Sequence, residues 1–116
     1  MSDLDEDFYN RADAHIHLSN DQMKEGVPRG KVSASNMYAT ARFNAWTSAC
    51  GWDDAEAFKA SKEETVAYFV DQYRKMLEHN FDDYAGNFER YMGGVEDGDA
   101  SSVRRDGRVE SSDRSS

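Results

Sequence analysis

The chain has 116 residues, a formal net charge of −9, one cysteine and a mean hydropathy of −0.92. This length fits one domain, and the acidic charge disfavours direct binding to nucleic acids or anionic membranes. A single cysteine excludes an intramolecular disulfide and a thiolate metal cluster within one chain. The acidic N-terminus is unlike a signal peptide, and no apolar run is long enough to cross a membrane, so we expect a cytoplasmic protein.

The composition changes at Gly93-Gly94. All six Phe, six Tyr and two Trp residues lie between Phe8 and Tyr91, and the last 22 residues contain none. A segment without large apolar side chains cannot form a packed core. The sequence therefore predicts a helical domain over 1–92 and a disordered tail over 93–116, rich in Ser, Asp, Gly and Arg.

The first predicted helix runs from about Asp5 to Lys24, because acidic residues precede an amphipathic pattern. It ends at a loop over 26–30 that holds the single Pro between two glycines. A second helix is predicted from Ala34 to Cys50, with Ser33 as its N-cap. Apolar residues lie on most of its sides, so we expect it to be the buried central helix.

A short connecting helix follows Trp52, with Asp53 as a candidate cap. The third long helix opens with Ser61 and Glu64, the spacing of a capping box, and then shows a clear helical period to about His79. The apolar pattern over 81–92 fits either a kinked continuation or a separate C-terminal helix. The predicted fold is all-α: a small bundle of three long helices, a short connecting helix and a C-terminal helix.

No motif indicates catalysis, a cofactor or a metal. Asp13, His15 and His17 resemble a metal-binding string. On a helix, however, residues i and i+2 point in directions about 200° apart, so the two histidine side chains diverge. Cys50 is interpreted as a packing residue, because the end of a helix dipole disfavours a thiolate there. The sequence favours a protein that is not an enzyme.

Two polar residues lie in the predicted central helix. If that helix is buried, Arg42 and Asn44 need partners. We expect Arg42 to form a buried or half-buried ion pair with a carboxylate from the first or third helix. Ligand binding by this pair is the alternative.

Four short stretches of the chain, taken together, form a recognisable sequence pattern. They are 5–13 (DEDFYNRAD), 30–35 (GKVSAS), 38–45 (YATARFNA) and 73–77 (YRKML). The region from Asp5 to Tyr91 resembles a proteobacterial domain-of-unknown-function family of small acidic proteins. The resemblance implies a helical fold and names no catalytic residue.

Fourteen aromatic residues are many for one small core, and this surplus suggests a function. Exposed aromatic patches mark protein interfaces. We therefore expect a protein-interaction or self-associating domain, with a two-fold dimer formed by the first or the C-terminal helix. Two alternatives are an acidic nucleic-acid mimic that blocks a DNA-binding protein, and a small ligand-binding or enzymatic bundle. The candidate interaction residues are Trp52, Tyr84, Phe88 and Tyr91.

Overall fold

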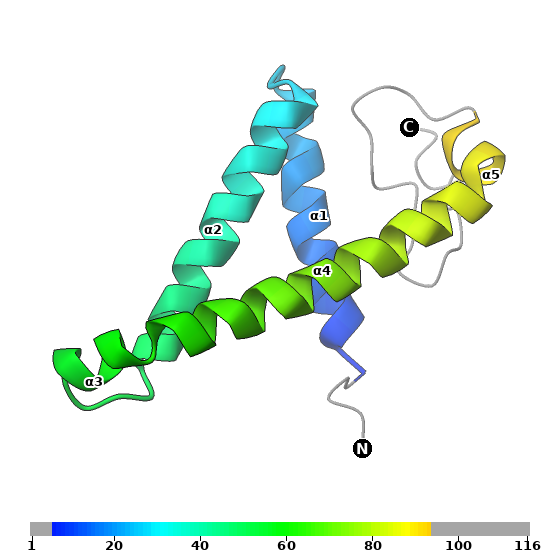
Figure 1. Cartoon of the computed structure of the whole chain (residues 1–116). Helices are drawn as coiled ribbons and strands as arrows, with labels where there is room; N and C mark the ends of the chain where they lie inside the picture. Colours follow the sequence, from blue (N-terminus) through cyan, green and yellow to red (C-terminus); the bar gives the residue numbers. More distant parts are fainter. Residues whose placement is uncertain (1–5, 94–116) are drawn as a thin grey trace. The chain divides into compact units, whose positions relative to one another are not determined.

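A computed structural model describes residues 6–93 (Figure 1). These residues form five helices and no strand: α1 (Phe8–Lys24), α2 (Arg29–Ala49), α3 (Ala55–Ala60), α4 (Lys62–Gly86) and α5 (Phe88–Met92). The predicted all-α class is confirmed, with three long helices, a short connecting helix and a short C-terminal one. The predicted tail lies outside the described residues except for Gly93. None of the described helices is long and apolar enough to cross a membrane.

The chain divides into two compact units. The terminal unit contains α1, the start of α2 up to Ser35, and α5 from Asn87 onward. The central unit contains residues 36–86, that is, most of α2, all of α3 and all of α4.

In the terminal unit, the turn between α1 and α2 is built by Gly26 and Pro28. Gly26 has a φ of +98°, a left-handed conformation that glycine adopts without steric cost. The Pro28 carbonyl accepts hydrogen bonds from the N–H groups of Lys31 (3.0 Å) and Val32 (3.2 Å). Proline favours the first turn of a helix because its φ is already helical and its missing N–H needs no partner there.

This start corrects the predicted one. Helix α2 begins at Arg29, five residues before Ala34, so Ser33 is inside the helix and is not its N-cap. Val32 is a helical residue and is buried, with 4% of its surface exposed. Asn20 and Tyr91 are the other buried residues of the described chain, and both belong to the terminal unit.

In the central unit, α3 joins the C-terminal end of α2 to the N-terminal end of α4 (Figure 1). The cap of α3 is Asp54, one residue after the predicted Asp53. Its Oδ1 atom accepts a hydrogen bond from the Ala57 N–H at 2.8 Å. Such a bond satisfies one of the amide groups that the first helical turn leaves unpaired.

The predicted capping box at the start of α4 does not form. Ser61 ends α3 in a helical conformation, and its hydroxyl donates to the Phe58 carbonyl at 2.7 Å. An N-cap residue needs an extended backbone, which the C-cap of α3 does not have. Helix α4 nevertheless begins at Lys62, as expected, because the Ser61 carbonyl accepts from the Thr65 N–H at 3.0 Å.

Helix α4 continues unbroken past His79 and Asn80. The Asn80 side chain does not interrupt it, because its Nδ2 donates to the Met76 carbonyl one turn earlier, at 2.7 Å. The chain leaves the helix after Gly86 and resumes as α5 at Phe88. The C-terminal helix is therefore separate, with its boundary at Asn87 rather than near His79.

The expectation that the second helix is buried on most sides is wrong. The aromatic side chains of α2 in the central unit are exposed: Tyr38 by 66%, Phe43 by 61% and Trp46 by 61%. Between Asn36 and Gly86 no residue is fully buried. Apolar residues on most sides of a helix indicate that the helix should be shielded from water. They do not indicate whether the same chain or another chain shields it.

Candidate functional site

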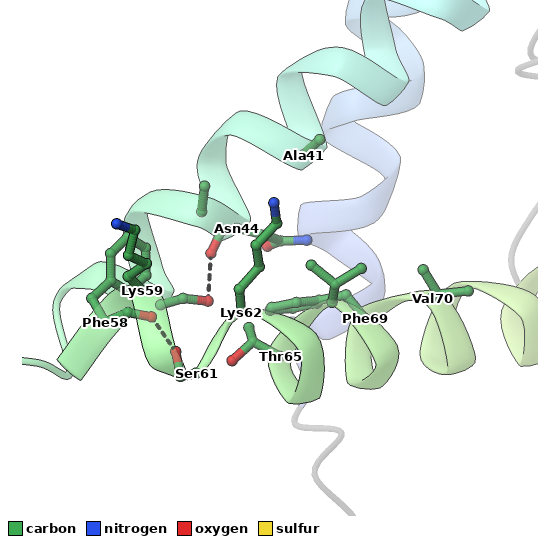
Figure 2. Close-up of a pocket in the computed structure, with 12 residues that line it drawn as sticks. Ala41, Asn44, Phe58, Lys59, Ser61, Lys62, Thr65, Phe69 and Val70 are labelled. Atoms are coloured by element: carbon green, nitrogen blue, oxygen red, sulfur yellow. Dashed lines mark hydrogen bonds between the residues drawn. The ribbon is translucent and has the colours of Figure 1, made fainter. Parts of the chain in front are cut away.

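The central unit carries an apolar groove between α2 and α4, closed at one end by α3. Its volume is about 540 Å³. Helix α2 lines it with small residues, since Ala41, Ala45 and Ser48 follow each other at helical spacing. Helix α4 lines it with larger ones, including Val66, Phe69 and Val70. Figure 2 shows this difference in size across the groove.

The groove has few polar groups free to act chemically. The hydroxyl of Ser48 donates to the Asn44 carbonyl at 2.8 Å, and the hydroxyl of Ser61 donates to the Phe58 carbonyl. Both hydroxyls are therefore engaged with the backbone of their own segment. Figure 2 shows the bond of Ser61 to Phe58. No Asp, Glu, His or Cys is among the lining residues, so the groove offers no carboxylate, imidazole or thiol for acid–base or nucleophilic chemistry.

The charged side chains of the groove are cationic. Lys59 and Lys62 line its α3 end, and Lys62 points from α4 toward Asn44 (Figure 2). No carboxylate is among the lining residues. In a chain with a net charge of −9, the charged residues that line this end of the groove are therefore both cations.

A second, shallower hollow lies on another face of α2. It has a volume of about 690 Å³ and is lined by Tyr38, Arg42, Phe43 and Trp46, among others. The rings of Phe43 and Trp46 are 5.6 Å apart at their centroids, with planes tilted by 41°. Trp, Tyr and Arg are the residue types that most often dominate protein–protein binding energies.

The structure separates the two polar residues singled out in α2. Arg42 lines the aromatic hollow, whereas Asn44 lines the groove. Arg42 is exposed and forms no ion pair among the described residues, so its predicted buried ion pair is wrong. The prediction failed because it rested on the burial of α2. Asn44 is half-buried, and its main-chain carbonyl accepts hydrogen bonds from the hydroxyls of Thr47 and Ser48.

The candidate aromatic residues fall in both units. In the central unit Trp52 is 46% exposed and Tyr84 is half-buried. In the terminal unit Phe88 is 58% exposed, whereas Tyr91 is fully buried. Tyr91 is therefore a core residue of that unit and is not part of an exposed patch.

Cys50 and the histidine string are also placed by the structure. Cys50 is exposed just after α2, so its interpretation as a packing residue is wrong. His15 and His17 are exposed on α1, and the predicted helix there is confirmed. Within the described part of the chain, no group of three or more His, Cys, Asp or Glu residues could hold a metal ion.

Sequence reasoning missed the exposed apolar stripe on α4. Its members lie on one face of the helix, and each is between 48% and 69% exposed: Val66, Val70, Tyr73, Met76, Leu77 and Phe81. The opposite face carries the ion pairs Lys75–Asp71 (3.1 Å) and Arg74–Glu78 (3.8 Å). The sequence shows this apolar period, but periodicity alone does not distinguish an exposed face from one side of a closed core.

Comparison with solved structures finds a protein of the same fold. It is described as "NMR structure of the protein NB7890A from Shewanella sp", and Shewanella is a proteobacterium. The two chains share 38% sequence identity with a TM-score of 0.66, and the match covers 82% of this chain and 100% of the other. No curated protein matches the chain.

Residues 8–85 match the sequence profile of a protein family, and they span α1 to almost the end of α4. This matches the resemblance inferred from the four characteristic stretches. The chain belongs to the family described as "Protein of unknown function (DUF3144)".

Proposed function

We propose that this domain is a non-enzymatic interaction domain, which binds a protein chain through the apolar surfaces of its central unit. One observation carries the proposal: the central unit exposes twelve large apolar side chains and fully buries no residue. The exposed residues are Met37, Tyr38, Phe43, Trp46, Trp52, Val66, Tyr68, Val70, Tyr73, Met76, Leu77 and Phe81.

The energetic reason is the balance between burial and conformational entropy. Ordering one residue costs about 1–2 kcal/mol, and burying apolar surface returns about 25 cal/mol per Å². Helices gain most of their stability in proteins by packing an apolar face against another element. A unit with two long helices and no buried residue lacks that packing, so we expect another chain to supply it.

The lining of the groove disfavours an enzyme. An active site needs convergent polar groups with suitable proton affinity, and a ligand site needs a few polar groups aimed at the ligand. The two serine hydroxyls of the groove are hydrogen-bonded to their own backbone. Arg42 and Asn44, the residues of the ligand-binding alternative, line different hollows.

The charge distribution on α4 disfavours the nucleic-acid mimic. A mimic needs a continuous row of unpaired carboxylates, as in a phosphate backbone. On α4, Asp71 and Glu78 are each paired with a cation, and these pairs interrupt such a row. For the cellular location, we propose the cytoplasm, which fits the single exposed thiol of Cys50 because that compartment keeps thiols reduced.

Photo-crosslinking in cells that naturally produce the protein tests the proposal. A photoreactive phenylalanine derivative would replace Tyr73 on the apolar stripe, Trp46 in the aromatic hollow or, as a control, Lys75 on the outer face of α4. We expect a crosslinked protein product from an apolar position and none from Lys75. If neither Tyr73 nor Trp46 yields a product above the Lys75 background, the domain does not act through these surfaces.

A further inference from the structure

We propose that the groove of the central unit holds helix α4 of a second copy, in an antiparallel arrangement with a two-fold axis near Tyr73. This proposal rests on the proposed interaction function and names its partner. It follows from three observations: the groove and the exposed stripe lie on the same helix, the apolar residues repeat symmetrically about Tyr73, and the charges at the two ends are opposite.

The first observation is the division of α4 into two halves. The N-terminal half, up to Val70, forms one wall of the groove. The C-terminal half carries the rest of the exposed stripe, from Tyr73 to Phe81, and does not line the groove. A two-fold axis between the halves would place the stripe of each copy in the groove of the other. Both copies then use the same surface, as a two-fold interface requires.

The second observation is a seven-residue repeat along the stripe. Two turns of an α-helix contain about seven residues, so residues seven apart lie along one line. Three such lines run along this side of α4: 62, 69, 76 and 83; 66, 73 and 80; and 70, 77 and 84. Their inner residues Phe69, Val70, Met76 and Leu77 are apolar and lie symmetrically about Tyr73, whereas Lys62, Asn80 and Asp83 at the ends are polar. In an antiparallel pair of α4 helices with the two-fold axis near residue 73, each row of residues faces the same row of the second copy.

This register pairs side chains that fit one another. Phe69 meets Met76 of the second copy, Val70 meets Leu77, and Tyr73 meets its own equivalent at the axis. Contacts between an aromatic ring and methionine sulfur are favourable. The small residues of α2, Ala41 and Ala45, leave room for the entering helix on the other side of the groove.

The third observation is the charge at the ends of the first line. The line of residues 62, 69, 76 and 83 begins with Lys62, a cation that lines the groove, and ends with Asp83. The antiparallel register brings these residues of opposite charge together, twice in each dimer. A parallel pair would instead place Lys62 beside Lys62 and Asp83 beside Asp83. Charge complementarity of this kind sets orientation and register.

The exposed area is of the size that a dimer requires. At roughly 100 Å² for each half-exposed large side chain, the six residues of the stripe supply roughly 600 Å² per copy. The α2 side of the groove adds to this, toward the roughly 800 Å² per partner of a standard interface. The chain's own residues 94–116 are a poor alternative occupant, since they contain no aromatic residue, Leu, Ile or Met.

Disulfide trapping of the full chain tests the geometry. In a Cys50→Ser background, Tyr73→Cys places one thiol per copy at the proposed axis, where the Cα atoms approach closely enough to be bridged. Lys75→Cys is the control on the opposite face of the same helix. Under mild oxidation we expect a covalent dimer from Tyr73→Cys and a monomer from Lys75→Cys. Equal crosslinking of the two variants would overturn the arrangement.

A charge exchange tests the register without depending on Tyr73. Lys62→Glu and Asp83→Lys should each raise the dimer dissociation constant about tenfold in sedimentation velocity, because each creates two like-charge pairs per dimer. The double variant Lys62→Glu/Asp83→Lys should restore most of the affinity. If the double variant is as weak as the two single changes together, the residues do not meet.

The outcomes separate this inference from the proposed function. A purified full chain that stays monomeric, at a mass near 13.2 kDa, overturns the second copy as occupant. If Tyr73 then crosslinks to a different protein in cells, the interaction function stands with another partner. If the chain is a dimer but fails the disulfide and charge-exchange tests, self-association stands and the α4 register is wrong.

Discussion

Asp54 holds the first turn of α3 through one hydrogen bond, from the Ala57 N–H to its Oδ1. Helix α3 has six residues, too few to be stable alone. It also carries Phe58, which lines both the groove and the aromatic hollow. A single cap therefore supports a wall that the two surfaces share.

We predict that Asp54→Ala destabilises the protein by about 1 kcal/mol, the usual cost of losing an N-cap side chain. Asp53→Ala is the matched control, since Asp53 is exposed one residue earlier and does not cap the helix. Urea unfolding followed by circular dichroism would measure both. Equal losses in the two variants would contradict the assignment of the cap to Asp54.

Two exposed glycines near the start of α2 should respond in opposite directions to alanine. A Cβ atom would meet nothing within 4 Å at either Gly26 or Gly30. Gly26 has a positive φ, so Gly26→Ala should cost about 1–2 kcal/mol. Gly30 is helical, so Gly30→Ala should be neutral or stabilising by up to about 1 kcal/mol. Thermal unfolding of the two variants measures this difference, and equal shifts would exclude the left-handed turn.

At the scale of elements, α2 presents two different faces. Its groove face is built from small side chains, and its other face carries Tyr38, Phe43 and Trp46. Small residues along one helix face let another helix approach closely. The groove therefore depends on the small size of the α2 side chains on one face, whereas the aromatic hollow depends on the large rings on the other.

Filling the groove should block self-association. Ala41 lines the groove and Ala39 lines the aromatic hollow, and both are exposed on the same helix. We predict that Ala41→Phe raises the dimer dissociation constant at least tenfold, because the new ring occupies the space proposed for the second α4. Ala39→Phe should leave the constant within about threefold. Light scattering across a dilution series distinguishes them, and a reversed order would place the interface on the aromatic hollow.

For the whole molecule, stability should depend on protein concentration. A partner that binds the folded state and not the unfolded one stabilises by mass action. If the central unit completes its packing with a second copy, the thermal midpoint should rise as the protein is concentrated from about 1 to about 100 μM. Calorimetry or fluorescence would record the shift. A midpoint that is constant over this range would indicate that one chain folds without a second copy.

The boundary near Gly93 also leads to a prediction for the whole molecule. Residues 95–116 contain no aromatic side chain and have little apolar surface to bury. Their deletion should leave the thermal midpoint nearly unchanged. A fall of more than about 5 °C, roughly 1 kcal/mol for a domain of this size, would show that they contribute to the folded domain.

The sequence by itself determined the all-α class, the order of the first four helices and membership of the family, but it left open whether the C-terminal helix is separate. The reason is that helical periodicity, glycine and proline punctuation and charge at helix starts are local properties of the chain. Helix boundaries were in error by one to about seven residues, and two of these errors arose where local signals competed. Helix α2 begins directly after Pro28, so Ser33 lies inside the helix and does not cap it. Ser61 ends α3 and bonds to Phe58, so it does not form the capping box of α4.

The tertiary structure alone decided what each apolar face meets. The sequence shows that Trp46 and Tyr73 lie on apolar faces, but it cannot show whether another part of the same chain covers them. In the structure both remain about half exposed or more, and this exposure turned a predicted core into a candidate interface. Exposure depends on contacts between segments far apart in the chain, and a periodic pattern carries no information about such contacts.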